Sequence, residues 1–232
     1  FEILCRGWLC AKGGKKVGNL HRDTINLVKA QSQAKYVDQL LPLLNEENSL
    51  FITGKLESKP YITMTVRAFG VFGYPGNNSP GTVTVEGDWS NGAFWVAAQI
   101  LGSSLSVQGL QEGSAQGDRA VVDITRQLLD GCSTVSAADI PDLVPILSVV
   151  ASAKHGAVFT DIRRLRLKES DRVATVMEMI ENLGGKAEAS DDTLTIHGTG
   201  LIGGTVDSHN DHRIAMAAAI AATVCQKPVT CR

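Results

Sequence analysis

Residues 164–172 read Arg-Leu-Arg-Leu-Lys-Glu-Ser-Asp-Arg, which places four cations and two carboxylates in one short segment. An amphipathic pattern continues over residues 170–183, and Gly184-Gly185 closes it as glycines close a helix C-terminus. Helix N-termini attract anions because their first N–H groups are unpaired and the helix dipole is positive there. The segment therefore predicts a helix that begins at an anion-binding surface.

A second charged cluster, Asn210-Asp211-His212-Arg213, opens a run built almost wholly from Ala, Ile and Met. A helix that is apolar on every side belongs in the interior of a domain. We expect this helix to be buried, with its charged N-terminus at the surface.

A pattern of strand, polar helix start, small apolar helix and strand recurs along the second part of the chain. It predicts an α+β fold of pseudo-symmetric units. Amphipathic helices are expected at 119–129 and 170–183, and a hairpin at 186–190 and 193–197. The repeated runs are 82–86, 91–101 and 105–109; 140–152 and 157–161; and 204–207, 212–225 and 228–231.

The first part of the chain predicts a helix at 35–44, a strand at 50–54 and a helix at 61–72. Residues 74–81 are rich in Pro, Gly and Asn, which favour turns. We therefore expect two domains, a partial first domain at 1–80 and a second at 81–232 that is incomplete at its C-terminus.

Composition excludes several classes of protein. The chain has 232 residues, 44% of them hydrophobic, and a net charge of −2, so nothing global indicates a nucleic-acid or membrane partner. It carries neither a signal peptide nor a bilayer-spanning apolar run, so we expect a cytoplasmic protein. The five cysteines lack metal-ligand spacing and are expected to be reduced thiols. A start at Phe1 and an end at Arg232, inside a predicted strand, suggest a fragment.

The repeated pattern contains three apolar helices, within 91–101, 140–152 and 212–225. If these helices run parallel, their N-termini emerge on one face beside the charged segment. That face would combine several cations, at least two carboxylates and a histidine, which suits a phosphorylated, polyanionic substrate. The contributing residues are Ser90-Asn91, Pro141-Asp142, Lys168, Glu169, Arg172 and Asp211-His212-Arg213.

Four of these residues also have a purely structural interpretation. Asp142 and Asp211 can cap their helices. Glu169 and Arg172 can form an ordinary i, i+3 surface pair. Only the convergence of the signals favours a functional site.

These motifs resemble those of the EPSP synthase (3-phosphoshikimate 1-carboxyvinyltransferase) family. The two strongest are 167–172 and 210–216, and 58–62, 85–91, 116–119 and 140–143 follow in the family's order and approximate spacing. The resemblance extends from about residue 49 to the end and corresponds to the C-terminal two-thirds of the family. The family's N-terminal part and last segment have no counterpart, and Gln31-Ser32-Gln33 only approximates its Ser-Ser-Gln motif.

The resemblance implies two domains, each a pseudo-threefold assembly of βαβαββ units around parallel buried helices, the inside-out α/β barrel. It places Ser58, Tyr61, Asp142 and Lys168 at shikimate 3-phosphate. It places Arg172, His212 and Arg213 at phosphoenolpyruvate. The implied catalytic residues are Asp142, as acceptor of the 5-hydroxyl proton, and Glu169, as acid/base at the phosphoenolpyruvate methylene.

The implied activity is transfer of the enolpyruvyl group of phosphoenolpyruvate to shikimate 3-phosphate, in the shikimate pathway to chorismate and the aromatic amino acids. The partners are these two small molecules, with no metal, organic cofactor, nucleic acid or membrane. Two alternatives stay open: a non-catalytic ligand-binding chain, and UDP-N-acetylglucosamine 1-carboxyvinyltransferase, which shares the fold. We expect the chain alone not to reach a family-typical rate, because cationic groups that the family uses are missing.

Overall fold

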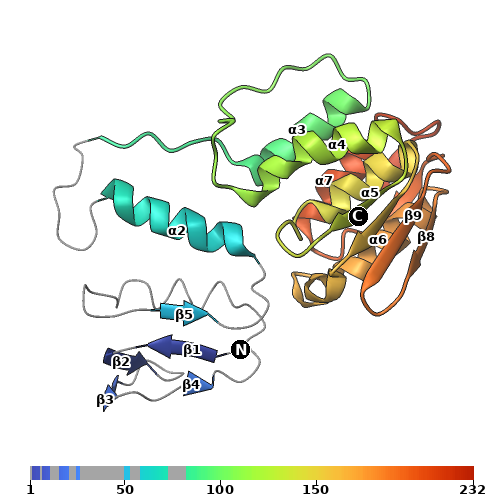
Figure 1. Ribbon diagram of the computed structural model, residues 1–232. Coiled ribbons are helices and arrows are strands. Elements are labelled where there is room, and N and C mark those ends of the chain that lie inside the picture. Colours follow the sequence, from blue (N-terminus) through green and yellow to red (C-terminus); the bar gives the residue numbers. More distant parts are fainter. Residues whose placement is uncertain are drawn as a thin grey trace. The chain divides into compact units, whose positions relative to one another are not determined.

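The computed structural model describes residues 2–5, 7–10, 16–20, 25–26, 50–52, 58–72 and 82–232 (Figure 1). The chain divides into two compact units, Phe1–Val85 and Glu86–Arg232. Within the described ranges, no helix has both the length and the apolar character needed to cross a membrane.

The described part of the first unit consists of short antiparallel strands and one helix. Strand β1 (Glu2–Cys5) pairs with β4 (Ile25–Asn26) and β5 (Leu50–Ile52), and β2 (Gly7–Cys10) pairs with β3 (Lys16–Leu20). Helix α2 (Lys59–Phe72) begins two residues before the predicted start. The predicted helix 35–44 and the turn-rich segment 74–81 lie outside the described residues.

The second unit is built around helices that pack on one another. These are α3 (Trp89–Ile100), α5 (Val144–Ala153) and α7 (His212–Ala221), flanked by α4 (Val121–Asp130) and α6 (Arg172–Asn182). Short 3-10 turns, η2 (Gly117–Ala120) and η3 (Ile162–Leu167), lead toward α4 and α6. All residues of α5 from Val144 to Ser152 are buried, as the apolar sequence predicted.

A mixed sheet packs beside these helices (Figure 1). Its order is β6 (Ser133–Ser136), β7 (Ala157–Thr160), β9 (Thr193–His197) and β8 (Lys186–Ala189). Strands β6 and β7 are parallel, whereas β7–β9 and β9–β8 are antiparallel. A separate parallel pair joins β10 (Gly204–Val206) to β11 (Val229–Cys231). The predicted hairpin and the predicted α+β class are therefore confirmed.

Two predicted strands, 82–86 and 105–109, are wrong, because neither segment has regular structure. One backbone bond, from Gly87 N to Gly109 O at 3.0 Å, connects the two regions. Gly109 has φ 85°, outside the strand region, and Val85 is 84% exposed, so the burial that stabilises a strand is missing there. Strand β6 was missed because Ser-Thr-Val-Ser contains a single apolar residue.

Candidate active site at the helix N-termini

Carboxylates at the starts of three helices accept hydrogen bonds from unpaired backbone N–H groups. Asp88 caps α3 through Ser90 N, Asp171 caps α6 through Val173 N and Ala174 N, and Asp211 caps α7 through Arg213 N. The capping interpretation therefore holds for Asp211. For Asp142 it is wrong: the N-cap of α5 is Leu143.

Arg172 lies at the centre of the site, with a side chain only 1% exposed. Its Nε donates to Asp211 Oδ2 at 2.7 Å, its Nη1 to Asp142 Oδ1 at 2.5 Å, and its Nη2 to Glu169 Oε2 at 2.5 Å. Burial alone would lower the pKa of this guanidinium, but Asp211 and Asp142 outweigh burial and raise it. One buried cation thus holds carboxylates from three separate segments together.

Asp142 is surrounded by cations. Its carboxylate lies 3.0 Å from Lys168 Nζ, 2.5 Å from Arg172 Nη1 and 3.6 Å from Arg213 Nη2. Burial would raise the pKa of Asp142, but the charges of Lys168, Arg213 and Arg172 outweigh it and lower the pKa to about 2. Asp142 is therefore ionised at neutral pH.

Arg213 joins the starts of α7 and α3. Its Nη2 donates to Ser90 Oγ at 2.8 Å, and its Nη1 lies 3.4 Å from the Ser90 carbonyl oxygen. Because Arg213 also approaches Asp142, the N-terminal ends of α3 and α7 meet beside the loop that precedes α5. This is the convergence of helix starts that the repeated pattern predicted.

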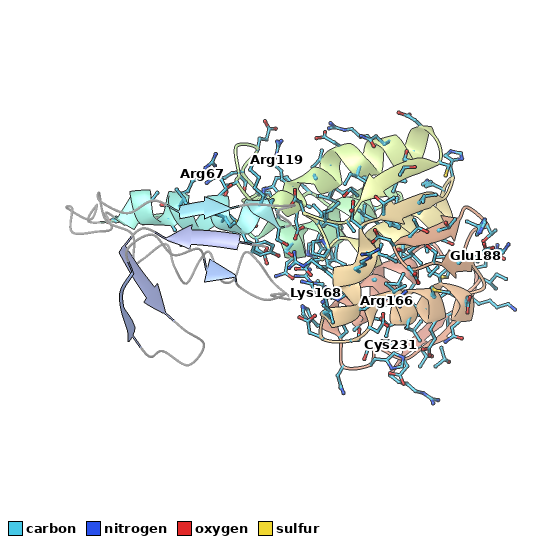
Figure 2. The ribbon with its side chains drawn as sticks, turned by 60° about the horizontal axis from the view of Figure 1, so that its bottom comes forward. Arg67, Arg119, Arg166, Lys168, Glu188 and Cys231 are labelled. Carbon is cyan, nitrogen blue, oxygen red and sulfur yellow. The ribbon has the colours of Figure 1, made fainter. Side chains whose placement is uncertain are left out.

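Five of the residues singled out from the sequence, namely Asp142, Lys168, Glu169, Arg172 and Arg213, lie together, and we call them the ion-pair network. Asp211 and Ser90, which were singled out too, bond to Arg172 and Arg213. Figure 2 shows Lys168 at one end of the second unit and Glu188 at the other. His212 is exposed at the first position of α7. Ser58 and Tyr61 belong to the first unit, at the start of α2, where Tyr61 N donates to Ser58 O at 3.1 Å.

Sequence reasoning assigned no function to two polar residues at this site. Ser170 donates to Asp211 Oδ2 at 3.0 Å. Buried Asp118 accepts a hydrogen bond from Ser90, and burial is the main reason that its pKa is raised. Both lie in motifs identified from the sequence, Ser170 in 167–172 and Asp118 in 116–119, and these motifs could have pointed to them.

The network suits an anionic ligand better than a metal. Among the described residues, no group of three or more His, Cys, Asp or Glu side chains is arranged to hold a metal ion. The network carboxylates lie against Arg and Lys side chains instead, and cations of this kind bind phosphate and carboxylate groups.

Comparison with known proteins matches residues 28–232 to the family model of EPSP synthase (3-phosphoshikimate 1-carboxyvinyltransferase). The 3-phosphoshikimate 1-carboxyvinyltransferase of Clostridium novyi is 35% identical over 237 residues, covering 87% of this chain and 54% of the relative. The enzyme of that name from Clostridium acetobutylicum is 38% identical over 220 residues, covering 82% and 51%. That of Brachyspira hyodysenteriae is 33% identical over 258 residues, covering 96% and 59%.

This chain thus spans about half the length of the curated relatives it matches. The family model covers nearly all of the sequence, including every residue of the ion-pair network. The chain belongs to the EPSP synthase family.

Proposed function

We propose that this chain is part of an enzyme that transfers the enolpyruvyl group of phosphoenolpyruvate to the 5-hydroxyl of shikimate 3-phosphate, releasing phosphate. The observation that carries the proposal is the ion-pair network, in which two arginines and a lysine lie within 4 Å of one ionised carboxylate. The names of the relatives favour this activity over the UDP-N-acetylglucosamine alternative.

Asp142 is the proposed acceptor of the 5-hydroxyl proton. A carboxylate with a pKa of about 2 is a weak base, and three neighbouring cations are what make it weak. An anionic substrate that engages Lys168 and Arg213 would neutralise part of their charge. The pKa of Asp142 would then rise toward a value at which it can take a proton.

Glu169 is the proposed acid/base at the phosphoenolpyruvate methylene. Its side chain is 50% exposed and bonded to Arg172, so it can reach a ligand while its partner stays buried. A solvent-accessible carboxylate and a buried one beside the same arginine provide two different environments for two proton transfers.

The anionic groups of the substrates are assigned to the cations. We place Lys168, together with Ser58, Tyr61 and Asp142, at shikimate 3-phosphate, and Arg172, Arg213 and His212 at phosphoenolpyruvate. Arg172 donates to three carboxylates, so it can contact a ligand only by releasing one of them, and partly exposed Glu169 is the least costly to release. Arg213 has fewer carboxylate partners than Arg172, so it is the better placed of the two to bind an anionic ligand.

The fold proposal is a two-domain protein with boundaries at 1–80 and 81–232, whose second domain consists of pseudo-symmetric βαβαββ units of the inside-out barrel type. The packing of α3, α5 and α7 with their N-termini together supports it. We further propose a cytoplasmic location and two small-molecule substrates, with no metal or organic cofactor.

Calorimetry on the 232-residue chain tests the assignment of the cations. Lys168→Ala should weaken binding of shikimate 3-phosphate by roughly 1.5 to 3 kcal/mol, the value of a charge-assisted hydrogen bond. Lys186→Ala is the matched control, because Lys186 is exposed and pairs with Glu188, which is also exposed. Equal affinity of the Lys168→Ala and wild-type chains would contradict the proposal.

A further inference from the structure

Ser90 and Asp118 lie beside Arg213, and the function proposed above assigns neither of them a role. Ser90 Oγ accepts a hydrogen bond from Arg213 Nη2 at 2.8 Å, and the Ser90 side chain also bonds to the Asp118 carboxylate. A serine hydroxyl has a single proton. Because the oxygen accepts from Arg213, that proton is available for Asp118.

Hydrogen bonds connect the segment that carries Ser90 to the segment that carries Asp118. The Gln116 side chain accepts from Trp89 N at 2.8 Å and donates to Gly87 O at 2.9 Å. The Trp89 indole donates to Gln111 O at 3.0 Å. Ser90 follows Trp89 directly, and Asp118 lies two residues after Gln116, so both are held by rigid neighbours.

Arg213 and Arg172 differ in what compensates their charge. Arg172 donates to three carboxylates at 2.7 Å or less. The shortest bond of Arg213 goes to the neutral Ser90 hydroxyl, and its carboxylate neighbour Asp142 is 3.6 Å away. The charge of Arg213 is therefore less compensated, which favours an incoming anion.

We propose that Ser90 and Asp118 are positioning residues: Asp118 orients the Ser90 hydroxyl, and Ser90 holds the Arg213 guanidinium apart from Asp142 for an anionic ligand. The identity of that ligand as phosphoenolpyruvate rests on the proposed function. The Ser90–Arg213 geometry does not depend on it.

The positioning is tested first without ligand, by nitrogen-15 NMR of the arginine side chains in the 232-residue chain. Arg213→Lys assigns the Arg213 signals, and buried Arg172 is the internal reference. In the wild-type chain we expect the Arg213 guanidinium protons to exchange slowly with solvent. Ser90→Ala should abolish this slow exchange, and Asp118→Ala should make the exchange faster. Ser90→Thr keeps a hydroxyl and should retain the slow exchange. The matched control Asp123→Ala alters an exposed carboxylate of α4 and should change nothing. Unchanged Arg213 signals in Ser90→Ala would overturn the proposal.

Phosphoenolpyruvate binding is tested next by a double-mutant cycle. Ser90→Ala should weaken binding roughly tenfold, equivalent to about 1.4 kcal/mol, in the wild-type background and not at all in the Arg213→Ala background. An equal loss in both backgrounds would show that Ser90 does not act through Arg213. If the wild-type chain does not bind phosphoenolpyruvate, the proposed function fails, while the NMR result still decides the positioning role.

Discussion

Among single residues, Arg172 is the buried charge of the second unit that needs the most hydrogen-bond partners. A guanidinium placed in an interior needs partners for its N–H groups, and Asp142, Glu169 and Asp211 accept four hydrogen bonds from it. Conversely, Asp211 is fully buried and depends on Arg172 for its charge compensation. Arg172 is thus a structural centre of the second unit.

Replacing Arg172 by Met should lower the free energy of unfolding by about 3 to 5 kcal/mol, because Asp142 and Asp211 lose their shared buried cation. Urea denaturation measures the change. Arg163→Met is the control, since Arg163 is largely exposed and its pair with Asp192 should contribute less than about 1 kcal/mol. Similar losses in the two variants would show that the buried network has no special role in stability.

The lowered pKa of Asp142 predicts a pH dependence of stability. Its folded-state pKa of about 2 lies below the ordinary 3.8, so the unfolded chain binds more protons between these values. The stabilisation is present above pH 4 and disappears as the pH falls through about 2. Asp142→Asn should therefore be less stable than wild type at pH 7, by the order of 2 kcal/mol, and the difference should shrink in acid.

Denaturation curves recorded from pH 7 to pH 2 measure this difference. The control is Asp123→Asn, which alters an exposed carboxylate and should follow the wild-type curve. A constant difference between Asp142→Asn and wild type over the whole range would contradict the assigned pKa.

At the scale of elements, the Ala-rich sequence of α7 explains how the helix starts come together. Ala217, Ala218 and Ala221 are fully buried, and small side chains let α7 pack against α5 and α3. The packing brings Arg213, at the start of α7, to Ser90, at the start of α3. Helix packing thus determines the geometry of the site.

A larger side chain inside this packing should be costly. Ala218→Leu should destabilise the chain by roughly 1 to 3 kcal/mol, because a close-packed interior has no room for the added atoms. Ala219→Leu, at the adjacent exposed position, introduces the same side chain where it meets solvent. Thermal unfolding of the two variants measures the difference, and equal midpoints would mean that α7 is not closely packed.

At the scale of the whole molecule, the described hydrophobic core lies entirely within the second unit. Its members run from Trp89 to Ala221, and the ion-pair network lies in the same unit. A unit that contains its own core can fold independently.

We therefore expect residues 86–232, expressed alone, to unfold cooperatively and to keep the slow exchange of the Arg172 side-chain protons. Circular dichroism and NMR test this against the full 232-residue chain. Non-cooperative melting of the shorter chain would show that its core depends on residues 1–85.

Much of the second unit follows from local patterns. Apolar runs predict α5 and α7, alternation and turn residues predict the β8–β9 hairpin, and charged starts mark the helix N-termini. The errors arose where local pattern is weak: the expected strands at 82–86 and 105–109 lack burial and regular φ angles, and β6 has one apolar residue.

The family resemblance, the mixed α+β class and the residues gathered at the helix starts can be predicted from the sequence, because these depend on short spacings and residue types. Which charges pair depends on the tertiary structure. Ser90 and Arg213 are 123 residues apart in the chain, and Arg172 and Asp211 are 39 apart. No local periodicity encodes such partners, since they meet only when α3, α5, α6 and α7 pack, and the neighbouring charges in that packing outweigh burial and shift the pKa values of Asp142 and Arg172.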